Sequence, residues 1–299
     1  MEKILVMLSS YNGEKYIEEQ IDTILTQTGV EVHLLVRDDG STDRTSIILD
    51  KYKNEGKLEW YGGKNLGWKA SFMNLAVNSP EYDYYAFSDQ DDHWKPEKLS
   101  SALEVLKTML QGPSLYMSNV IYWENGVDKG LSLPEKVRTD IYHSLLFCES
   151  FGCTMLFNKE LMAIIKKAPP KLDVAHDFWF TQVASIFGTI YYDKHSYILY
   201  RQHENNQLGY DKFFIEKNKR RLKTYLNIWH NHELDIQAQE LLHCYKSLMT
   251  KEQEKIVSVV AYYRRSISYY LKLLFSKKYS HDSLATNIGL KFRILIRHI

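Results

Sequence analysis

The sequence predicts an α/β protein in which a mostly parallel central sheet is flanked by helices and followed by a C-terminal α-helical extension. Over the first 110 residues, short apolar runs alternate with segments whose apolar residues recur at helical spacing, which indicates successive strand and helix units. Polar loops follow several of these runs, as expected where parallel strands end at one edge of a sheet. Later in the chain, Phe213–Met249 and Glu252–Phe275 keep helical spacing and lack Pro and Gly, which indicates a separate helical layer.

Four strand and helix units are predicted before residue 111. The strands are Ile4–Leu8, Val32–Val36, Leu58–Tyr61 and the run that begins at Tyr84. The helices are Lys15–Gln27, a segment capped by Ser41 or Thr42 that ends at Tyr52, a segment after Gly67, and Pro96–Leu110. This alternation predicts a parallel, doubly wound arrangement. The loop after the first strand lacks the Gly-x-Gly-x-x-Gly pattern, so an ordinary dinucleotide-binding fold is not indicated.

The segment between Leu115 and Arg201 has a different character, because antiparallel strands are predicted there. The predicted elements are, in order, an antiparallel pair at Leu115–Asn119 and Val120–Trp123 with a turn at Glu124–Gly126, a polar loop over Lys129–Asp140, a strand at Thr154–Phe157, a helix at Lys159–Lys167, and strands at Gly188–Asp193 and Ser196–Arg201.

Charge is distributed unevenly, although the formal net charge is only +1. Residues 251–299 contain ten Lys and Arg against three Asp and Glu, which suggests an anionic partner for this tail.

The three cysteines, an odd number without metal-site spacing, are expected to be free thiols in a reducing compartment. The N-terminal apolar run is too short for a signal peptide, and no apolar stretch approaches the roughly 18 residues of a membrane span. We therefore expect a cytoplasmic protein.

Three carboxylates follow the fourth predicted strand: Asp89, Asp91 and Asp92. Acids at the carboxyl end of a strand would lie at the ligand-binding edge of an open α/β sheet. Carboxylates this close repel one another, and their hard oxygen atoms suit Mn²⁺ or Mg²⁺. The alternative is a solvated acidic turn before a helix, because Pro96 opens the next segment as proline commonly opens a helix.

A second acidic loop, Arg37–Asp43, follows the second predicted strand. The carboxylates of Asp38 and Asp39 can accept hydrogen bonds from a pyrimidine N–H or from ribose hydroxyls, and Tyr11, after the first strand, can stack on a base. An ordinary turn that caps the next helix explains the same residues. Both interpretations fit this segment.

The C-terminal segments combine apolar and basic residues. One stripe consists of Val259, Val260, Tyr263, Ile267, Tyr270, Leu271 and Leu274, with Arg264, Arg265 and Lys272 beside it. The last segment, Ile288–Ile299, mixes large apolar residues with Lys291, Arg293 and Arg297. Such a composition is typical of a helix that lies on an anionic membrane surface. A pair of helices that packs on the rest of the protein or on another subunit explains the pattern equally well.

Ordered motifs run from the first strand to Asn206. They are Ser10–Ile17, Arg37–Asp43, Asn65–Gly67, Phe87–Trp94, His176-Asp177 and Tyr200–Asn206. In these motifs the chain resembles the family 2 glycosyltransferases, which are inverting enzymes with the Rossmann-like GT-A fold. Within that family it is most similar to the bacterial rhamnosyltransferase-like branch, which builds cell-surface polysaccharides such as capsule and cell-wall polymers. The resemblance covers residues 1–210.

The resemblance implies roles for particular residues. It places Ser10, Tyr11, Asn12, Asp38, Asp39, Asn65, Lys69 and Asp89 around the nucleotide. It makes Asp91 and His203, together with Asp89, the ligands of a Mn²⁺ or Mg²⁺ ion, and it makes Asp177 the catalytic base. The candidates for contact with the donor or acceptor sugar are Asp92, Trp94, His176, Trp179 and Arg201. Phe72 departs from the family pattern, because many members have an arginine there, and we expect Lys69 or Arg201 to supply its contact with the diphosphate.

The implied organisation is a GT-A catalytic domain, residues 1–210, with a nucleotide-binding half (1–110) and an acceptor half (111–210), followed by a helical region (211–299). The implied activity is inverting transfer of a sugar, rhamnose from dTDP-rhamnose as the first expectation, to a lipid-linked saccharide at the inner face of the membrane. A UDP-hexose or UDP-N-acetylhexosamine donor, a glycoprotein acceptor, and a non-catalytic scaffold that binds nucleotide-sugars are the alternatives. Residues 251–299 are expected to contact the membrane or to form a homodimer, and no nucleic-acid partner is expected.

Overall fold

The computed structural model describes residues 1–109, 111–203 and 234–299, which group into two units. The first unit contains the sheet, and the second is helical in its described part. The first comprises Met1–Thr139, Cys148–Pro169 and Asp173–His203, and the second comprises Asp140–Phe147, Pro170–Leu172 and the described residues after 233.

Strands of the first unit form one nine-stranded sheet within the described residues. Its order is β3-β2-β1-β4-β8-β6-β9-β5, and β7 pairs with β6. The strands are β1 (Lys3–Ser10), β2 (Glu31–Asp38), β3 (Glu59–Gly62), β4 (Tyr84–Ser88), β5 (His93–Trp94), β6 (Ser114–Glu124), β7 (Val127–Leu131), β8 (Leu156–Asn158) and β9 (Thr189–Arg201). The predicted α/β class is confirmed. The strands β3, β2, β1 and β4 are parallel neighbours, and β6 and β9 also pair in parallel.

The parallel strands end at one common edge. Ser10 at the end of β1 pairs with Asp38 at the end of β2, and Leu8 pairs with Ser88 at the end of β4. Asp38 is in turn the register partner of Gly62, the last residue of β3. The polar loops that follow these strands therefore leave the sheet side by side, which is the arrangement that forms ligand sites in open α/β sheets.

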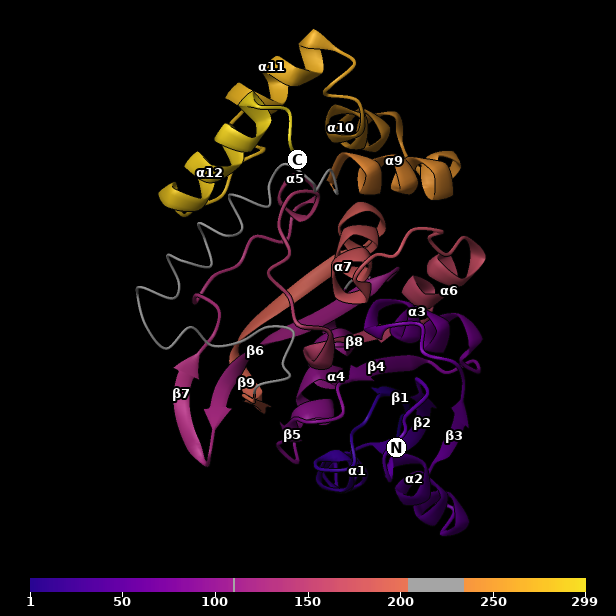
Figure 1. Cartoon of the computed structure of the whole chain (residues 1–299). Coiled ribbons are helices and arrows are strands. Elements are labelled where there is room, and N and C mark those ends of the chain that lie inside the picture. The colour runs from indigo at the N-terminus through magenta and orange to yellow at the C-terminus, as the bar shows by residue number, and fades with distance from the viewer. Residues whose placement is uncertain (110, 204–233) are drawn as a thin grey trace. The chain divides into compact units, whose positions relative to one another are not determined.

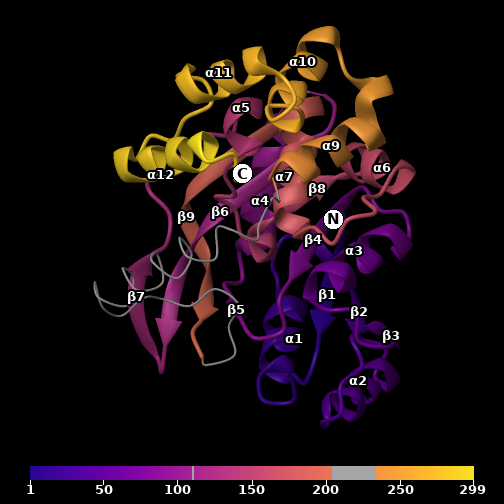
Figure 2. The same ribbon diagram turned by 45° about the horizontal axis from the view of Figure 1, so that its top comes forward.

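Helices cover both faces of the sheet in the first unit (Figures 1 and 2). They are α1 (Ile17–Leu25), α2 (Thr45–Asn54), α3 (Trp68–Asn78), α4 (Lys98–Thr108), α6 (Lys159–Lys167) and α7 (His176–Phe187). α1, α2 and α4 share a buried core with alternate residues of β1, namely Ile4, Val6 and Leu8. Leu5 and Met7 are also buried and point to the opposite face, where α3 contacts α6 and α7. Burial on both faces explains why β1 is apolar throughout.

The predicted antiparallel pair is wrong in its partners. Leu115–Asn119 and Val120–Trp123 belong to one strand, β6, and its antiparallel partner is β7. The chain reverses at Asn125 and Gly126, whose φ angles of 50° and 80° are those of a two-residue hairpin turn. β7 therefore takes up the beginning of the predicted Lys129–Asp140 loop, and Figure 1 shows β6 and β7 as a long hairpin.

Two further boundaries differ from the prediction. The two strands predicted between Gly188 and Arg201 are one strand, β9, in which the register against β6 shifts and Lys194 and His195 bulge out of the ladder. A bulge interrupts the alternation of apolar residues without ending the strand, so the sequence pattern suggests two pieces. The strand predicted at Thr154–Phe157 is β8, and it begins only after a 3-10 turn.

The second unit contains five described helices. They are α5 (Ile141–Ser144), α9 (Leu234–Tyr245), α10 (Lys251–Ala261), α11 (Ile267–Phe275) and α12 (Leu284–Leu295), with a 3-10 turn at Lys246–Leu248. Residues 213–233 of the predicted Phe213–Met249 helix, the 210/211 domain boundary, Glu204–Asn206 of the last motif and residue 110 lie outside the described residues. The helices of the described part are too short or too polar to cross a bilayer.

The helix predicted over Glu252–Phe275 is divided into α10 and α11. The chain leaves the helical path after Tyr262, and Ser266 then caps α11 by accepting a hydrogen bond from the N–H of Tyr269 (3.4 Å). The predicted apolar stripe is divided at the same place. Its first part, including Val259, is buried, whereas Ile267 in its second part is exposed.

Candidate active site

The loop after β1 is hydrogen-bonded to the loop after β2. Ser10 Oγ donates to Asp38 Oδ1 (3.2 Å), and the backbone N–H of Asn12 donates to Ser41 Oγ (2.8 Å). Asn12 Oδ1 in turn accepts a hydrogen bond from the N–H of Thr42 (2.8 Å). Asn12 has a φ of 47°, in the left-handed region that asparagine tolerates better than most residues. Ser10 and Asn12, both expected at the nucleotide, thus fix the shape of these two loops.

Gln90 connects the loop after β4 to the loop after β1. Its Oε1 accepts a hydrogen bond from the N–H of Tyr11 (2.9 Å), and its Nε2 donates to the carbonyl of the same residue (3.1 Å). A Cβ atom at Gly13 would lie 2.3 Å from Gln90 Oε1, so glycine leaves the room that this contact needs. The Tyr11 side chain is exposed, and its ring is therefore available to stack on a base.

The carboxylates of Asp38 and Asp39 accept hydrogen bonds that fix the neighbouring loops. The Asp39 carboxylate accepts hydrogen bonds from the N–H groups of Leu66 (2.8 Å) and Gly67 (2.9 Å) and forms an ion pair with Arg37. Both aspartates are buried. The protein's own donors thus use part of the hydrogen-bonding capacity of these carboxylates, and a contact with base or ribose would use the lone pairs that remain.

Asp91 and His203 lie against each other, although 112 positions separate them in the chain. The distance between Asp91 Oδ2 and His203 Nε2 is 2.6 Å. The Tyr16 ring stacks on the imidazole of His203, with 5.2 Å between centroids and 20° between planes. The turn before α1 thereby fixes the orientation of the imidazole. The two groups are hydrogen-bonded to each other here. A small separation would let the carboxylate oxygen and the imidazole nitrogen both bind a single divalent cation.

Arg201 places a positive charge beside this pair. Its Nε donates to the backbone carbonyl of Asp91 (2.8 Å), and its Nη2 contacts Glu19 Oε2 (2.7 Å). The guanidinium carbon lies 4.7 Å from the ring centroid of Tyr16 and 4.4 Å from that of Trp123. A guanidinium held by two aromatic faces and two polar contacts has little freedom, so the end of β9 carries a fixed cation.

Asp89 and Asp92 complete the cluster of acids. Burial, followed by the charges of Asp91 and Asp177, raises the pKa of Asp89 to about 7. Burial also raises the pKa of Asp92. Ligand atoms of Asp89, Asp92 and Cys153 lie within 4.8 Å of one another. A divalent cation nearby would stabilise the charged forms of these acids.

Asp177 lies in the first turn of α7, where its Oδ1 accepts a hydrogen bond from the N–H of Phe178 (2.7 Å). The adjacent His176 ring packs 4.7 Å from the ring of Phe87, which precedes Asp89 by two residues. This contact brings the start of α7 to the end of β4, in agreement with the effect of Asp177 on the pKa of Asp89. Burial raises the pKa of Asp177 itself to about 6, although backbone N–H groups oppose this shift.

Four of the residues expected to contact sugar are buried. Trp94 and Trp179 expose no ring face, so the prediction that they stack on a sugar is wrong. Trp94 instead lies under the ammonium group of Lys98, 3.6 Å from its ring centroid. Asp92 and His176 are also buried. Among these candidates, Arg201 keeps partial exposure.

His176 belongs to an aromatic cluster. Its ring stacks on Phe72 (4.0 Å, 27°) and meets the rings of Phe87 (4.7 Å) and Trp68 (6.2 Å) edge-on. Burial lowers the pKa of His176 to about 3, so the ring is neutral near pH 7. Phe72, the position that departs from the family pattern, is thus the stacking partner of His176.

Lys69 and Asn65 lie at the rim of the site. Lys69 Nζ is 3.4 Å from the backbone oxygen of Asp173, and its charge acts to lower the pKa of Asp177. Asn65 is exposed, and its Oδ1 accepts a hydrogen bond from the N–H of Gly67 (3.0 Å). Both side chains can reach a ligand at this rim.

Several residues that organise the site were not predicted from the sequence. Tyr16, which contacts both His203 and Arg201, lies inside the motif Ser10–Ile17, so the motif was its only signal. Trp123 and Lys98 carry no local signal, because their importance comes from neighbours far away in the chain.

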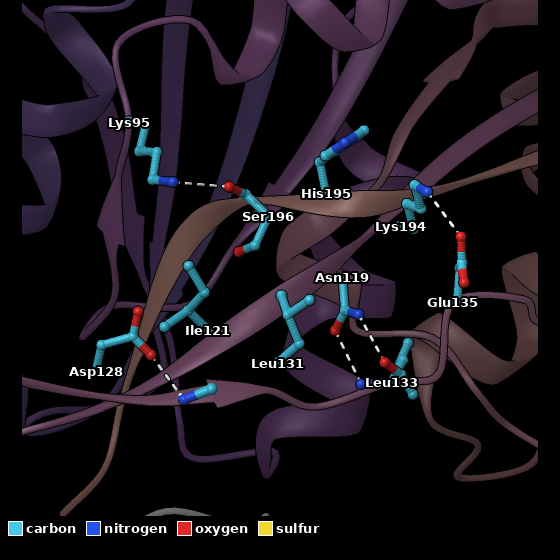
Figure 3. Close-up of a pocket in the computed structure, with 11 residues that line it drawn as sticks. Lys95, Asn119, Ile121, Asp128, Leu131, Leu133, Glu135, Lys194, His195 and Ser196 are labelled. Atoms are coloured by element: carbon cyan, nitrogen blue, oxygen red, sulfur yellow. Dashed lines mark hydrogen bonds and ion pairs between the residues drawn. The ribbon is translucent and has the colours of Figure 1, made fainter.

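A separate pocket of about 560 Å³ opens on the sheet (Figure 3). Ile121, Leu131 and Leu133 give it apolar walls. Lys95 and Lys194 at its rim each contact an oxygen atom of the protein, at 2.9 and 2.7 Å. The candidate metal ligands and the candidate base do not line it, so this pocket is not the site built by the loops.

Fold and site together define the class of this protein: it is a glycosyltransferase with the GT-A fold. The chain belongs to glycosyltransferase family 2, because the model of the family described as glycosyl transferase family 2 matches residues 5–161. The predicted family and fold are thereby confirmed.

Among curated relatives, the dTDP-rhamnosyl transferase RfbG of Shigella flexneri is 31% identical over 244 residues, which cover 76% of this chain and 82% of that protein. The UDP-Glc:alpha-D-GlcNAc-diphosphoundecaprenol beta-1,3-glucosyltransferase WfaP of Escherichia coli is 28% identical over 108 residues, or 36% of this chain and 43% of that protein. Among solved structures, that of S. aureus TarS residues 1–349 in complex with UDP-GlcNAc matches with a TM-score of 0.58 and 19% identity, over 98% of this chain and 81% of that one. At this identity, the match supports the fold alone.

Proposed function

We propose that the protein transfers a sugar with inversion, in a metal-dependent reaction, from a nucleoside diphosphate to a saccharide acceptor during synthesis of a cell-surface polysaccharide. The observation that carries this proposal is the Asp91–His203 contact of 2.6 Å at the strand end to which α7 brings Asp177. We propose dTDP-rhamnose as the donor, because RfbG matches most of the chain. A lipid-linked acceptor agrees with the diphosphoundecaprenol acceptor in the name of WfaP.

Asp91 and His203 would hold Mn²⁺ or Mg²⁺, with Asp89 beside them. Their carboxylate oxygen and imidazole nitrogen form a donor set that such ions accept. When bound, the cation stabilises the negative charge that develops on the leaving diphosphate. Arg201 adds a positive charge at the same place and, in this proposal, supplies the contact that an arginine at the position of Phe72 makes in other family members.

Asp177 would act as the base that takes the proton from the acceptor hydroxyl. As that oxygen forms a bond to the anomeric carbon, the bond between this carbon and the diphosphate oxygen breaks, and the diphosphate leaves with the electron pair. A single displacement of this kind inverts the configuration at the anomeric carbon. It needs no nucleophile from the enzyme.

The pKa of Asp177 predicts how activity depends on pH. A carboxylate accepts a proton only above its pKa, which burial raises to about 6, so kcat/KM should fall about tenfold per pH unit below this value. The pH–rate profile should be measured at saturating Mn²⁺, because any weaker binding of the metal at low pH is then offset. If the pH at which activity falls changes with the Mn²⁺ concentration, the pH dependence comes from the metal ligands instead.

The donor is tested by thermal shift with Mn²⁺ and a panel of nucleotide-sugars, followed by a transfer assay with the stabilising donor. We expect dTDP-rhamnose to raise Tm more than UDP-glucose or UDP-N-acetylglucosamine, since at equal concentration the ligand that binds more tightly stabilises the folded state more. A larger shift with a UDP-sugar would replace the rhamnosyl assignment by the hexosyl alternative. Donor binding without consumption of donor in the presence of saccharide acceptors would favour the non-catalytic scaffold.

We further propose residues 1–210 as the catalytic domain. Its nucleotide-binding half (1–110) supplies the loops joined by Asn12 and Gln90, and its acceptor half (111–210) supplies Asp177, Arg201 and His203. The helical region, 211–299, follows. We place the reaction in the cytoplasm at the inner face of the membrane, where a nucleotide-sugar and a lipid-linked acceptor meet.

A further inference from the structure

α11 presents large apolar side chains to solvent. Ile267, Leu271 and Phe275 recur every four residues, so they lie on one face of the helix. Their exposed fractions range from 47% to 76%. Single exposed apolar residues are normal on protein surfaces, but a continuous row along a helix marks an interaction site.

α12 has the same property. Leu284, Ile288, Phe292 and Leu295 follow a helical repeat and are between 49% and 73% exposed. We call the seven residues of both helices the apolar face of α11 and α12. Figure 1 shows the two helices in the C-terminal part of the chain, coloured orange to yellow.

The opposite sides of these helices are already used for packing within the second unit. Leu273 of α11 is buried, as are Leu290 and Ile294 of α12. The ammonium group of Lys291 donates to the carbonyls of Leu273 (2.8 Å) and Tyr279 (2.7 Å), which ties α12 to the end of α11. One face of each helix is therefore packed within the second unit, and the exposed apolar residues lie on another face.

The segment that carries the apolar face is basic. The segment 262–299 contains eight Lys and Arg and a single acidic residue, Asp282. The basic residues are Arg264, Arg265, Lys272, Lys277, Lys278, Lys291, Arg293 and Arg297. Lys277 and Lys278, in the connection between the two helices, and Arg297, just after α12, are exposed. This charge complements an anionic surface.

We propose that α11 and α12 bind the surface of an anionic lipid bilayer, with their apolar face in the headgroup region and the exposed Lys277, Lys278 and Arg297 against lipid phosphates. Helices with one apolar and one basic side bind membranes in this way without crossing them. The long stem of the exposed Lys277 allows its ammonium group to reach a phosphate while apolar neighbours insert, and Lys278, whose ammonium group lies 3.4 Å from Tyr142 Oη, would exchange that contact for a phosphate. This proposal is independent of which donor sugar the enzyme uses.

Charge favours the bilayer over a second copy of this chain. In a two-fold symmetric dimer the same patch lies on both sides of the interface. A dimer through α11 and α12 would therefore oppose two strongly basic segments that hold one acidic residue each. Like charges across an interface disfavour association, whereas an anionic bilayer is attracted to them.

The test is co-sedimentation of the full-length protein with phosphatidylcholine vesicles, with and without phosphatidylglycerol. We expect binding to the anionic vesicles that weakens as salt is added. The Leu271→Ser/Ile288→Ser variant, with one change in each helix, should reduce the partition coefficient at least about tenfold. The matched control is Val127→Ser/Leu131→Ser on β7, which removes two similarly exposed apolar side chains and should leave vesicle binding unchanged.

Charge is tested separately with Lys277→Ser/Lys278→Ser, which should weaken binding to anionic vesicles and reduce its salt dependence. Lys51→Ser/Lys53→Ser on α2 is the control, because it removes the same charge from another exposed helix. Equal binding to neutral and anionic vesicles, or no binding to either, would overturn the proposal. The proposal would also be overturned if light scattering detected a dimer of the wild-type protein that Leu271→Ser/Ile288→Ser abolishes while vesicle binding stays unchanged. Nucleotide binding should be the same in all variants, so a failure here is distinct from a failure of the proposed function.

Discussion

Asp177→Asn is expected to lower kcat by about two orders of magnitude or more, with donor affinity nearly unchanged. An amide cannot take the proton from the acceptor hydroxyl at any pH of the assay. It nevertheless keeps an oxygen that can accept the hydrogen bond from the N–H of Phe178, so the first turn of α7 should be preserved. The measurement is steady-state transfer together with calorimetric titration of the donor.

The matched control for this variant is Asp173→Asn. Asp173 is an exposed aspartate that contacts Lys69, the same lysine whose charge acts on Asp177. It should lose little activity, because its carboxylate is not at the end of β4. Equal losses in the two variants, or full turnover in Asp177→Asn, would remove the assignment of Asp177 as the base.

Asp91→Ala is expected to abolish Mn²⁺-dependent binding of the nucleotide. The substitution removes one of the two ligand atoms that lie 2.6 Å apart, and a lone imidazole binds a hard divalent ion poorly. His203→Ala should have a similar effect, and the double variant should be little worse than either single one, because the two side chains act as a unit. Calorimetric titration of nucleotide with Mn²⁺ and with EDTA measures this.

Another His–Asp contact on the surface provides the control. His195 Nδ1 lies 2.8 Å from Asp193 Oδ1, in the bulge of β9. His195→Ala should leave nucleotide binding unchanged with and without metal. If wild-type protein binds nucleotide equally in Mn²⁺ and in EDTA, Asp91 and His203 do not form a metal site for the donor.

The N-terminal half of the fold could be predicted because its signals are local. Strands buried on both faces give short apolar runs such as Ile4–Leu8, and each run is followed by a polar loop. The prediction of the hairpin formed by β6 and β7 failed for a related reason. The turn residues Asn125 and Gly126 were visible, but the partner strand after them, Val127–Leu131, is exposed throughout and gives no apolar signal.

The C-terminal helices show a different limit. No proline or glycine marks the break between α10 and α11, and the helix restarts because Ser266 caps it. A serine inside an apolar pattern does not distinguish a cap from an ordinary helical position. The exposed face of α11 therefore looked continuous with the buried face of α10.

For the site, the sequence predicted which residues come together but not which contacts each side chain makes. The resemblance to known enzymes placed Asp91 and His203 together, which their separation in the chain would not have allowed. It could not tell that Asp39 also holds the loop at Leu66 and Gly67 by accepting hydrogen bonds from their backbone N–H groups. It also could not tell that Trp94 and Trp179 are enclosed, since a tryptophan beside a polar loop looks the same whether it faces a ligand or the core.

The reciprocal hydrogen bonds between the Gln90 side chain and the Tyr11 backbone have a consequence for engineering. In a chimera, residues 11–13 could be replaced by those of a relative that prefers another nucleotide while Gln90 is kept. The new loop would then not be matched to the Gln90 side chain. The backbone groups at position 11 would still bind Gln90, but a side chain imported at position 13 would clash with Gln90, and relief of that clash would displace the loop that carries Asp91. Donor preference and catalytic competence in this enzyme should therefore be exchanged together, as one cassette made of both loops.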